Sequence, residues 1–221
     1  MTQVEHDAAA IARTRALFPH LTDPQVLGDV VRPADERAEW VTGANNYVWY
    51  HLVGAYYRPR RVLEIGTRYG YSLWAVLKGA GFVGGVGTGG QHPPPEVTCY
   101  DAEVDDDVEP LRFVEKWFGR RGVEVRAFRQ DTQKLIALDV PDPVDYALVD
   151  ADHSYVGCLH DCELAWAALR PGGVLAVDDT EPGGEVRRAA EAFCLGRGVP
   201  WAYLPTFRGL HLVRKPTEVG K

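Results

Sequence analysis

Residues 144–180 read VDYALVDADHSYVGCLHDCELAWAALRPGGVLAVDDT, and this stretch decides the fold. It contains two short apolar runs, 146–149 and 174–177, separated by a segment of helical length and the breaker sequence RPGG at 170–173. Short apolar runs that flank a helix are typical of neighbouring parallel strands. We therefore expect a strand–helix–strand unit here, with both strands inside one sheet.

Each of these apolar runs ends in acidic residues. Asp150 and Asp152 follow the first run, and Asp178 and Asp179 follow the second. In open sheets of parallel strands, the carboxyl ends of the strands line the ligand crevice. The two acid pairs should therefore lie at the same edge, close enough to share a cation or a substrate.

The rest of the chain continues the alternation of strands and helices. Further strands are expected at 61–64, 97–100 and 123–128, and helices at 71–79, 105–119, 133–138 and 185–195. The last two apolar runs, 201–204 and 210–214, are separated by a turn at Arg208-Gly209 and resemble an antiparallel pair. The pattern predicts an α/β fold with a doubly wound, mostly parallel sheet.

Residues 1–59 are expected to form a helical extension that packs on a core domain spanning 60–221. Helical spacing occurs at 6–18, near Asp23-Pro24, at 35–41 and at 45–57. The segment 45–57 is rich in aromatic residues, so it is either a packing helix or part of the roof over a ligand pocket. The glycine-rich segment 81–96 is either a disordered loop or a lid.

Composition narrows the class of protein. The chain has 221 residues, 46% of them hydrophobic and 25% charged, which suits one globular domain. A net charge of -7 and a sequence pI of about 5.5 argue against nucleic-acid or anionic-membrane partners. The N-terminus lacks a signal-peptide pattern and no apolar stretch is long enough to span a bilayer. We expect a cytoplasmic protein with reduced thiols, Cys158 and Cys162 sharing one buried helix face.

The first predicted strand leads into the glycine turn Gly66-x-x-x-Gly70. Such turns cradle nucleotide-containing ligands, but a dinucleotide fingerprint needs a second glycine where Arg68 stands. Glu64 lies two residues before the turn and would repel a diphosphate. The same carboxylate would attract a cofactor that carries ammonium and sulfonium groups. The turn therefore favours S-adenosylmethionine over NAD.

Two further acids follow the second and third strands. Asp101 is placed to accept hydrogen bonds from ribose hydroxyls, with Glu103 as the rival if the strand ends later; it could also be a solvated acid at a helix start. Asp131 is placed to accept from an adenine amino group, and it could equally be the N-cap residue before Gln133.

Four motifs together resemble the class I S-adenosylmethionine-dependent methyltransferases. They are EIGTRYGYS at 64–72, DADHSY at 150–155, RPGG at 170–173 and DD at 178–179. The likeness is greatest to the small O-methyltransferase branch that includes catechol, caffeoyl-CoA and antibiotic-sugar enzymes. It implies a Rossmann-like seven-stranded sheet in the order 3-2-1-4-5-7-6 with the last strand antiparallel. The cofactor-binding residues would be Glu64, Gly66, Thr67, Gly70, Ser72, Asp101, Asp131, Thr132 and Asp150.

The resemblance also implies a metal site and a base. In metal-dependent members a divalent cation is held at positions that correspond to Asp150, Asp178 and Asp179, and carboxylate ligands favour Mg²⁺ over Zn²⁺. Asp152 matches the base proposed in the sugar-modifying relatives. His153 is a second candidate, since its unperturbed pKa lies near neutrality. A metal-free alternative leaves the acids to orient ligands or cap segments, with His153 as the base.

We therefore expect an S-adenosylmethionine-dependent O-methyltransferase, assisted by Mg²⁺, that acts on a hydroxyl of a natural product, sugar or phenol. Relatives often form homodimers or larger homo-oligomers, so a homo-oligomer is expected here. Three alternatives stay open: an N-methyltransferase of the same fold, an NAD-dependent oxidoreductase and a non-enzymatic protein that keeps the cofactor pocket.

Overall fold

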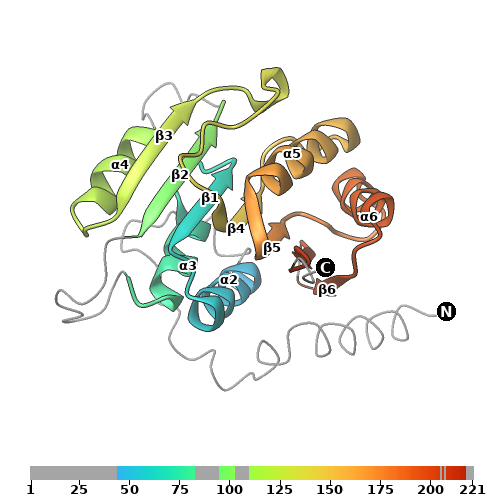
Figure 1. Ribbon diagram of the computed structural model, residues 1–221, viewed down its shortest axis with the longest axis horizontal. Helices are drawn as coiled ribbons and strands as arrows, with labels where there is room; N and C mark the ends of the chain where they lie inside the picture. Colours follow the sequence, from blue (N-terminus) through green and yellow to red (C-terminus); the bar gives the residue numbers. More distant parts are fainter. Residues whose placement is uncertain (1–43, 83–94, 103–109, 205, 207, 218–221) are drawn as a thin grey trace.

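The computed structural model describes residues 44–82, 95–102, 110–204, 206 and 208–217. Their strands form one sheet in the order β3-β2-β1-β4-β5-β7-β6 (Figure 1). The first five strands in this order, β3, β2, β1, β4 and β5, run parallel, and β7 is antiparallel to both of its neighbours. The expected sheet order and the antiparallel last strand are confirmed. The strands are β1 (Arg61–Ile65), β2 (Glu96–Asp101), β3 (Glu124–Arg129), β4 (Val144–Val149), β5 (Leu169–Val177), β6 (Trp201–Leu204) and β7 (Leu210–Arg214).

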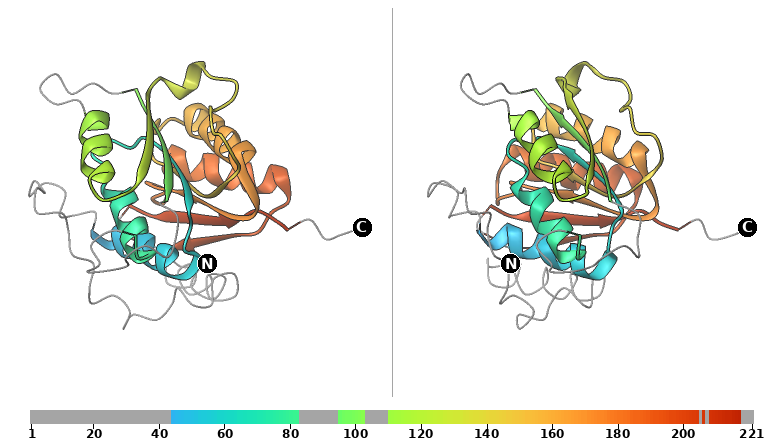
Figure 2. Two further views of the ribbon diagram at one scale, coloured as in Figure 1. Left: turned by 60° about the vertical axis from the view of Figure 1, so that its left-hand side comes forward. Right: turned by 90° about the vertical axis from the view of Figure 1, so that its left-hand side faces the viewer.

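Helices cover both faces of the sheet (Figure 2). One core cluster includes Val62 of β1 and packs under α2, α3 and α4, while the other includes Leu63 and packs under α5 and α6. Successive side chains of a strand point to opposite faces, so one buried strand supplies both clusters. The helices are α2 (Ala44–Tyr57), α3 (Tyr71–Gly79), α4 (Pro110–Gly119), α5 (Tyr155–Ala168) and α6 (Glu185–Arg197).

The aromatic segment expected at 45–57 is helix α2, and it packs closely on α3. A Cβ atom on Gly54 would lie 2.0 Å from the carbonyl oxygen of Val76, and one on Gly79 would lie 1.9 Å from that of His51. Glycine at these two positions lets the two backbones touch. This close contact fixes the N-terminal turn of α2 beside the carboxyl end of the sheet.

Some sequence-based boundaries need correction. The helix expected at 133–138 is only a 3₁₀ turn, η3 (Thr132–Lys134), and the chain then continues without regular structure to β4. The RPGG sequence does not separate a helix from a strand: α5 ends at Ala168, and β5 already begins at Leu169. Proline is tolerated there because the pairing of β4 with β5 is irregular between Val144 and Tyr146.

Several other expectations fall outside the described residues: the helices before residue 44, most of the segment 81–96 and the rival acid Glu103. Cys158 and Cys162 are both buried on α5, as expected, and all four cysteines are free. Among the helices that the structure describes, none is long and apolar enough to cross a membrane.

Candidate active site

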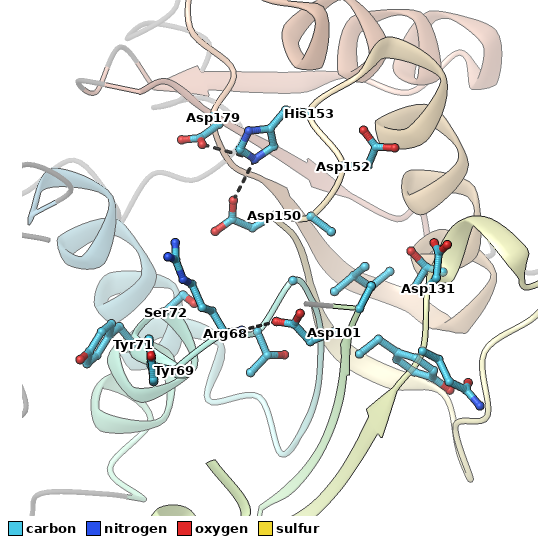
Figure 3. A pocket seen from close by; sticks show the side chains of 18 of the residues that line it. Arg68, Tyr69, Tyr71, Ser72, Asp101, Asp131, Asp150, Asp152, His153 and Asp179 are labelled. Atoms are coloured by element: carbon cyan, nitrogen blue, oxygen red, sulfur yellow. Dashed lines mark hydrogen bonds and ion pairs between the residues drawn. The ribbon is translucent and has the colours of Figure 1, made fainter. Parts of the chain in front are cut away.

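A cavity of about 350 Å³ lies at the carboxyl ends of the parallel strands (Figure 3). Its walls come from the ends of β1, β2, β3, β4 and β5, from Tyr47 of α2 and from Arg208, which precedes β7. This volume falls within the range of small-molecule sites. Of the expected site residues, the cavity is lined by Gly66, Thr67, Ser72, Asp101, Asp131, Thr132, Asp150, Asp152, His153 and Asp179.

The glycine turn after β1 touches the end of β4. Gly66 has a φ of 88°, and a Cβ atom there would lie 1.9 Å from the carbonyl oxygen of Asp150. The backbone N–H of Asp150 in turn donates to the carbonyl of Ile65 over 2.9 Å. Only glycine allows this approach, which brings Asp150 beside the turn.

Glu64 lies beneath the turn and is almost fully buried. The Ser72 hydroxyl donates to one of its carboxyl oxygens, while Oε2 is buried without a hydrogen-bond partner among the described residues. Burial raises the pKa of Glu64 to about 8, against the opposing effect of Ser72. A cationic ligand group close by would favour the ionised form of this carboxyl.

Asp101 ends β2 and faces the cavity. Its Oδ2 accepts a hydrogen bond of 2.6 Å from the backbone N–H of Arg68, a residue with a positive φ of 46°. The carboxylate therefore supports the glycine turn and is held in place at the cavity wall. A fixed carboxylate at the end of the second strand can accept hydrogen bonds from ribose hydroxyls.

Asp131 caps the η3 turn. It accepts from the backbone N–H of Gln133 at 3.0 Å and pairs with Lys134 at 2.9 Å, and this hydrogen bonding lowers its pKa. The neighbouring Thr132 points toward α5, where its hydroxyl donates to the buried Asp161 over 2.6 Å. The N-cap alternative for Asp131 is thus realised, and the turn presents Asp131, Thr132 and Gln133 at the cavity wall.

Two acids and two basic residues converge where β4 and β5 end. His153 Nε2 lies 3.7 Å from Asp150 and 3.4 Å from Asp179. Arg208 Nη1 contacts both carboxylate oxygens of Asp179, at 3.2 and 2.9 Å. The close contact with Asp150, and then the charge of Asp179, raise the pKa of His153 to about 9. Burial raises the pKa of Asp150, against the opposing effect of His153.

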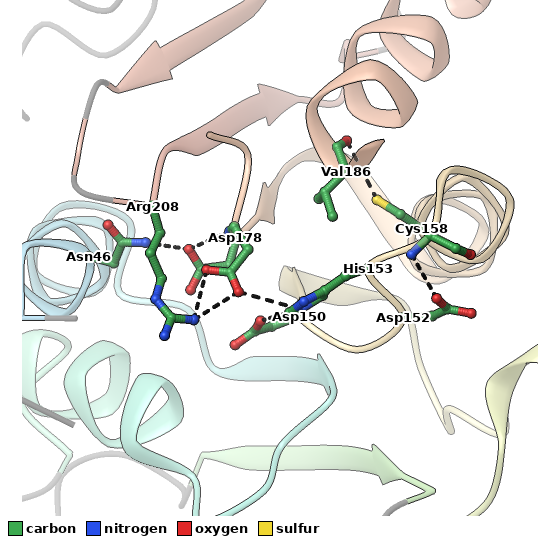
Figure 4. Close-up of polar contacts among 10 residues, drawn as sticks. Asn46, Asp150, Asp152, His153, Cys158, Asp178, Val186 and Arg208 are labelled. Carbon is green, nitrogen blue, oxygen red and sulfur yellow. Dashed lines mark hydrogen bonds and ion pairs between the residues drawn. The ribbon is translucent and has the colours of Figure 1, made fainter. Parts of the chain in front are cut away.

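Asp178, the other acid after β5, does not join this group. Its carboxylate accepts from the Asn46 side chain of α2 and from the backbone N–H of Asp179 (Figure 4). Burial and then the charges of Asp150 and Asp179 raise its pKa to about 8. Asp178 therefore links the end of β5 to α2.

The two candidate bases are oriented differently. Asp152 accepts from the backbone N–H of Ser154 at 2.8 Å and lies against the first turn of α5. Figure 3 shows its carboxylate apart from Asp150 and Asp179, whereas the His153 ring points between them. Of the two, only His153 contacts both acids.

The residues present do not fit the expected Mg²⁺ site. Asp150, His153 and Asp179 offer ligand atoms within 4.8 Å of one another. In this group an imidazole replaces the carboxylate expected from Asp178, whereas Mg²⁺ selects oxygen ligands in near-octahedral geometry. The guanidinium of Arg208 also forms an ion pair with the Asp179 carboxylate. Mg²⁺ therefore has no part in the chemistry proposed for this site.

Arg208, Asn46 and Asp161 contact expected site residues, and no sequence pattern predicted these contacts. Arg208 belongs to a turn motif, and its separation of 29 residues from Asp179 hides the contact. Asn46 lies 132 residues from Asp178. Asp161 carried a local signal, since an acid beside two buried cysteines in an apolar helix needs a polar partner.

Comparison with known proteins agrees with this fold. A family model described as a methyltransferase domain matches residues 63–180, and no curated protein matches the chain. Three solved structures share the fold: the Bacillus cereus O-methyltransferase in complex with SAH (21% identity, 94% of this chain, 97% of that chain, TM-score 0.54), the SAH-bound Podospora anserina methyltransferase PaMTH1 (16%, 97%, 97%, 0.57) and the Streptomyces achromogenes O-methyltransferase TomG in complex with SAM (18%, 95%, 88%, 0.54).

These identities are low, so the solved structures establish the fold alone. The family match covers more than half of the chain and spans the glycine turn, Asp101 and the acids after β4 and β5. Together with the sheet order, this match places the chain in the class I S-adenosylmethionine-dependent methyltransferase family.

Proposed function

We propose that this protein transfers the methyl group of S-adenosylmethionine to a hydroxyl oxygen of a small molecule, such as a natural product, a sugar or a phenol. One observation carries the proposal: His153, set against Asp150 and Asp179, lines the same cavity as the glycine turn and Asp101. The proposed donor site and the proposed base thus line one cavity. TomG, which is involved in tomaymycin synthesis, and the Bacillus cereus protein are O-methyltransferases of the same fold, which supports oxygen as the acceptor atom.

The donor would lie along the carboxyl ends of β1, β2 and β3. Asp101 would accept from the ribose hydroxyls, and the η3 turn with Asp131 would flank the adenine. Ser72 and the buried Glu64 beneath the turn would favour the ammonium group at the amino-acid end of the donor.

The acceptor would lie beside His153. The imidazole takes the hydroxyl proton, the acceptor oxygen attacks the methyl carbon, and the C–S bond breaks to give S-adenosylhomocysteine. Asp150 and Asp179 stabilise the imidazolium that forms. Holding the two reactants in line supplies much of the rate, since proximity and orientation are worth about 7–11 kcal/mol.

Calorimetry and a turnover assay test this proposal. S-adenosylhomocysteine should bind, and NAD should not. A panel of phenols and sugars should yield methyl ethers, measured by mass spectrometry, while the matching O-blocked acceptors yield none. Binding of NAD without S-adenosylhomocysteine, or methylation of nitrogen alone, would refute the proposed reaction.

Asp101→Asn should weaken binding of S-adenosylhomocysteine about 10–100-fold. The amide keeps an oxygen for the Arg68 N–H but loses the charged acceptor offered to the ribose, and a hydrogen bond to a charged group is worth about 1.5–3 kcal/mol. Isothermal titration calorimetry measures the change. The control is Asp142→Asn, because Asp142 pairs with Arg61 outside the cavity and its loss should leave affinity unchanged.

A further inference from the structure

Arg208 lies at a junction that the fold makes tight. A Cβ atom on the next residue, Gly209, would lie 2.5 Å from the carbonyl group of Thr180, and Gly209 has a φ of 75°. The Thr180 backbone N–H donates to the carbonyl of Gly209. These contacts hold the residue before β7 against the residues after β5. The position of Arg208 beside Asp179 therefore follows from the backbone.

The backbone of Asp179 adopts an unusual conformation at this contact. Asp179 has a φ of 53°, which is uncommon for a residue other than glycine. Its side chain is only 10% exposed, and both carboxylate oxygens face Nη1 of Arg208. An arginine keeps its positive charge at every accessible pH. The buried acid thus has a permanent counter-charge within the protein.

The neighbouring acids also have partners within the protein. His153 Nε2 lies 3.7 Å from Asp150 and 3.4 Å from Asp179. Asp178 accepts from Asn46 and from a backbone N–H. A divalent ion at this point would have to compete with Arg208 for the Asp179 carboxylate.

We infer that Arg208 takes the place of a divalent cation in this site, so that methyl transfer proceeds without a metal. The inference rests on the proposed function. Within the described residues, both contacts of Arg208 with Asp179 use Nη1. A guanidinium carries five N–H donors. The donors that Asp179 does not use can point from the cavity wall to the acceptor oxygen. A fixed positive charge beside that oxygen stabilises the alkoxide or phenolate that forms.

Metal binding tests the inference directly. The wild-type protein, Arg208→Gln and Arg208→Lys are each titrated with Mg²⁺ and Mn²⁺ by calorimetry, and Mn²⁺ binding is also followed by electron paramagnetic resonance. Arg208→Gln exposes the Asp179 carboxylate and should bind Mn²⁺ at least about tenfold more tightly than the wild type. Arg208→Lys keeps the charge and should resemble the wild type. Arg170→Gln, which removes an exposed ion pair to Asp145, is the control.

Turnover gives the second measurement. Wild-type activity should be unchanged by excess chelator and by added Mg²⁺. A stoichiometric wild-type Mn²⁺ site that is lost in Asp150→Asn, together with inhibition by chelator, would overturn the inference. Binding of S-adenosylhomocysteine is measured on the same samples. If it fails, the proposed function is wrong; if it succeeds while the wild type requires a metal, only the role of Arg208 is wrong.

Discussion

Replacing His153 with Gln should lower kcat by about 10²–10⁴-fold, the usual contribution of a general base. Glutamine keeps a polar side chain of similar reach but cannot take a proton from the acceptor hydroxyl. Affinity for S-adenosylhomocysteine should change little, because Asp101 and the glycine turn that form the donor site are untouched. Steady-state turnover and calorimetry on the same variant measure the two effects separately.

The pH profile should identify the same group. The close contact with Asp150, and then the charge of Asp179, raise the pKa of His153 to about 9. The imidazole is therefore protonated at neutral pH and cannot act as a base until the proton leaves. We expect kcat/KM to rise with pH up to about 9 in the wild type, and the rise to disappear in His153→Gln. A base of this strength suits an acceptor hydroxyl as acidic as a phenol, whose pKa is about 10.

Asp152→Asn is the matched comparison for the rival base. Asp152 accepts from the Ser154 N–H, and an asparagine oxygen can accept the same hydrogen bond. This change should reduce turnover by less than about fivefold, or about 1 kcal/mol in the activation barrier, because the Asp152 carboxylate lies apart from Asp150 and Asp179. If Asp152→Asn lost more activity than His153→Gln and also removed the pH dependence, Asp152 would be the base.

Patterns over short distances predicted the sheet well. The strands flanking 155–168 and the acids after them follow from alternation of apolar runs and helical segments. The order β3-β2-β1-β4-β5-β7-β6, which the family resemblance implied, is confirmed by the structure. The same reasoning placed Glu64, Asp101 and Asp150 at one edge. In the structure all three belong to, or directly follow, neighbouring strands. Strand ends are predictable because parallel pairing fixes them at a common edge.

The direction of each side chain at that edge could not be predicted. Asp178 and Asp179 are adjacent, yet one faces α2 and the other faces Arg208. The backbone of Asp179, with a positive φ, separates them. Which acid meets a cation also depends on partners far away in sequence, at Asn46 and Arg208. Local spacing carries no information on such contacts, so the three-carboxylate magnesium site was a reasonable expectation that the geometry does not fit.

Gly66→Ala should be among the most disruptive single substitutions in the chain. The new Cβ atom would lie 1.9 Å from the carbonyl oxygen of Asp150 and 2.4 Å from its carbonyl carbon, so β1 or β4 must move. The φ of 88° adds strain for any side chain. We expect a loss of roughly 3–5 kcal/mol in the free energy of unfolding and loss of measurable binding of S-adenosylhomocysteine. Chemical denaturation and calorimetry measure both effects.

Gly122→Ala is the matched control, because it introduces backbone strain without a steric overlap. Gly122 also has a positive φ, 78°, but a Cβ atom there would meet no atom within 4 Å. That variant should lose only about 1–2 kcal/mol, the cost of a left-handed backbone for alanine, and should bind S-adenosylhomocysteine normally. The difference between the two variants therefore measures how closely the turn after β1 approaches the end of β4. Equal stability and equal affinity in both would mean that this approach does not position Asp150 against the donor site.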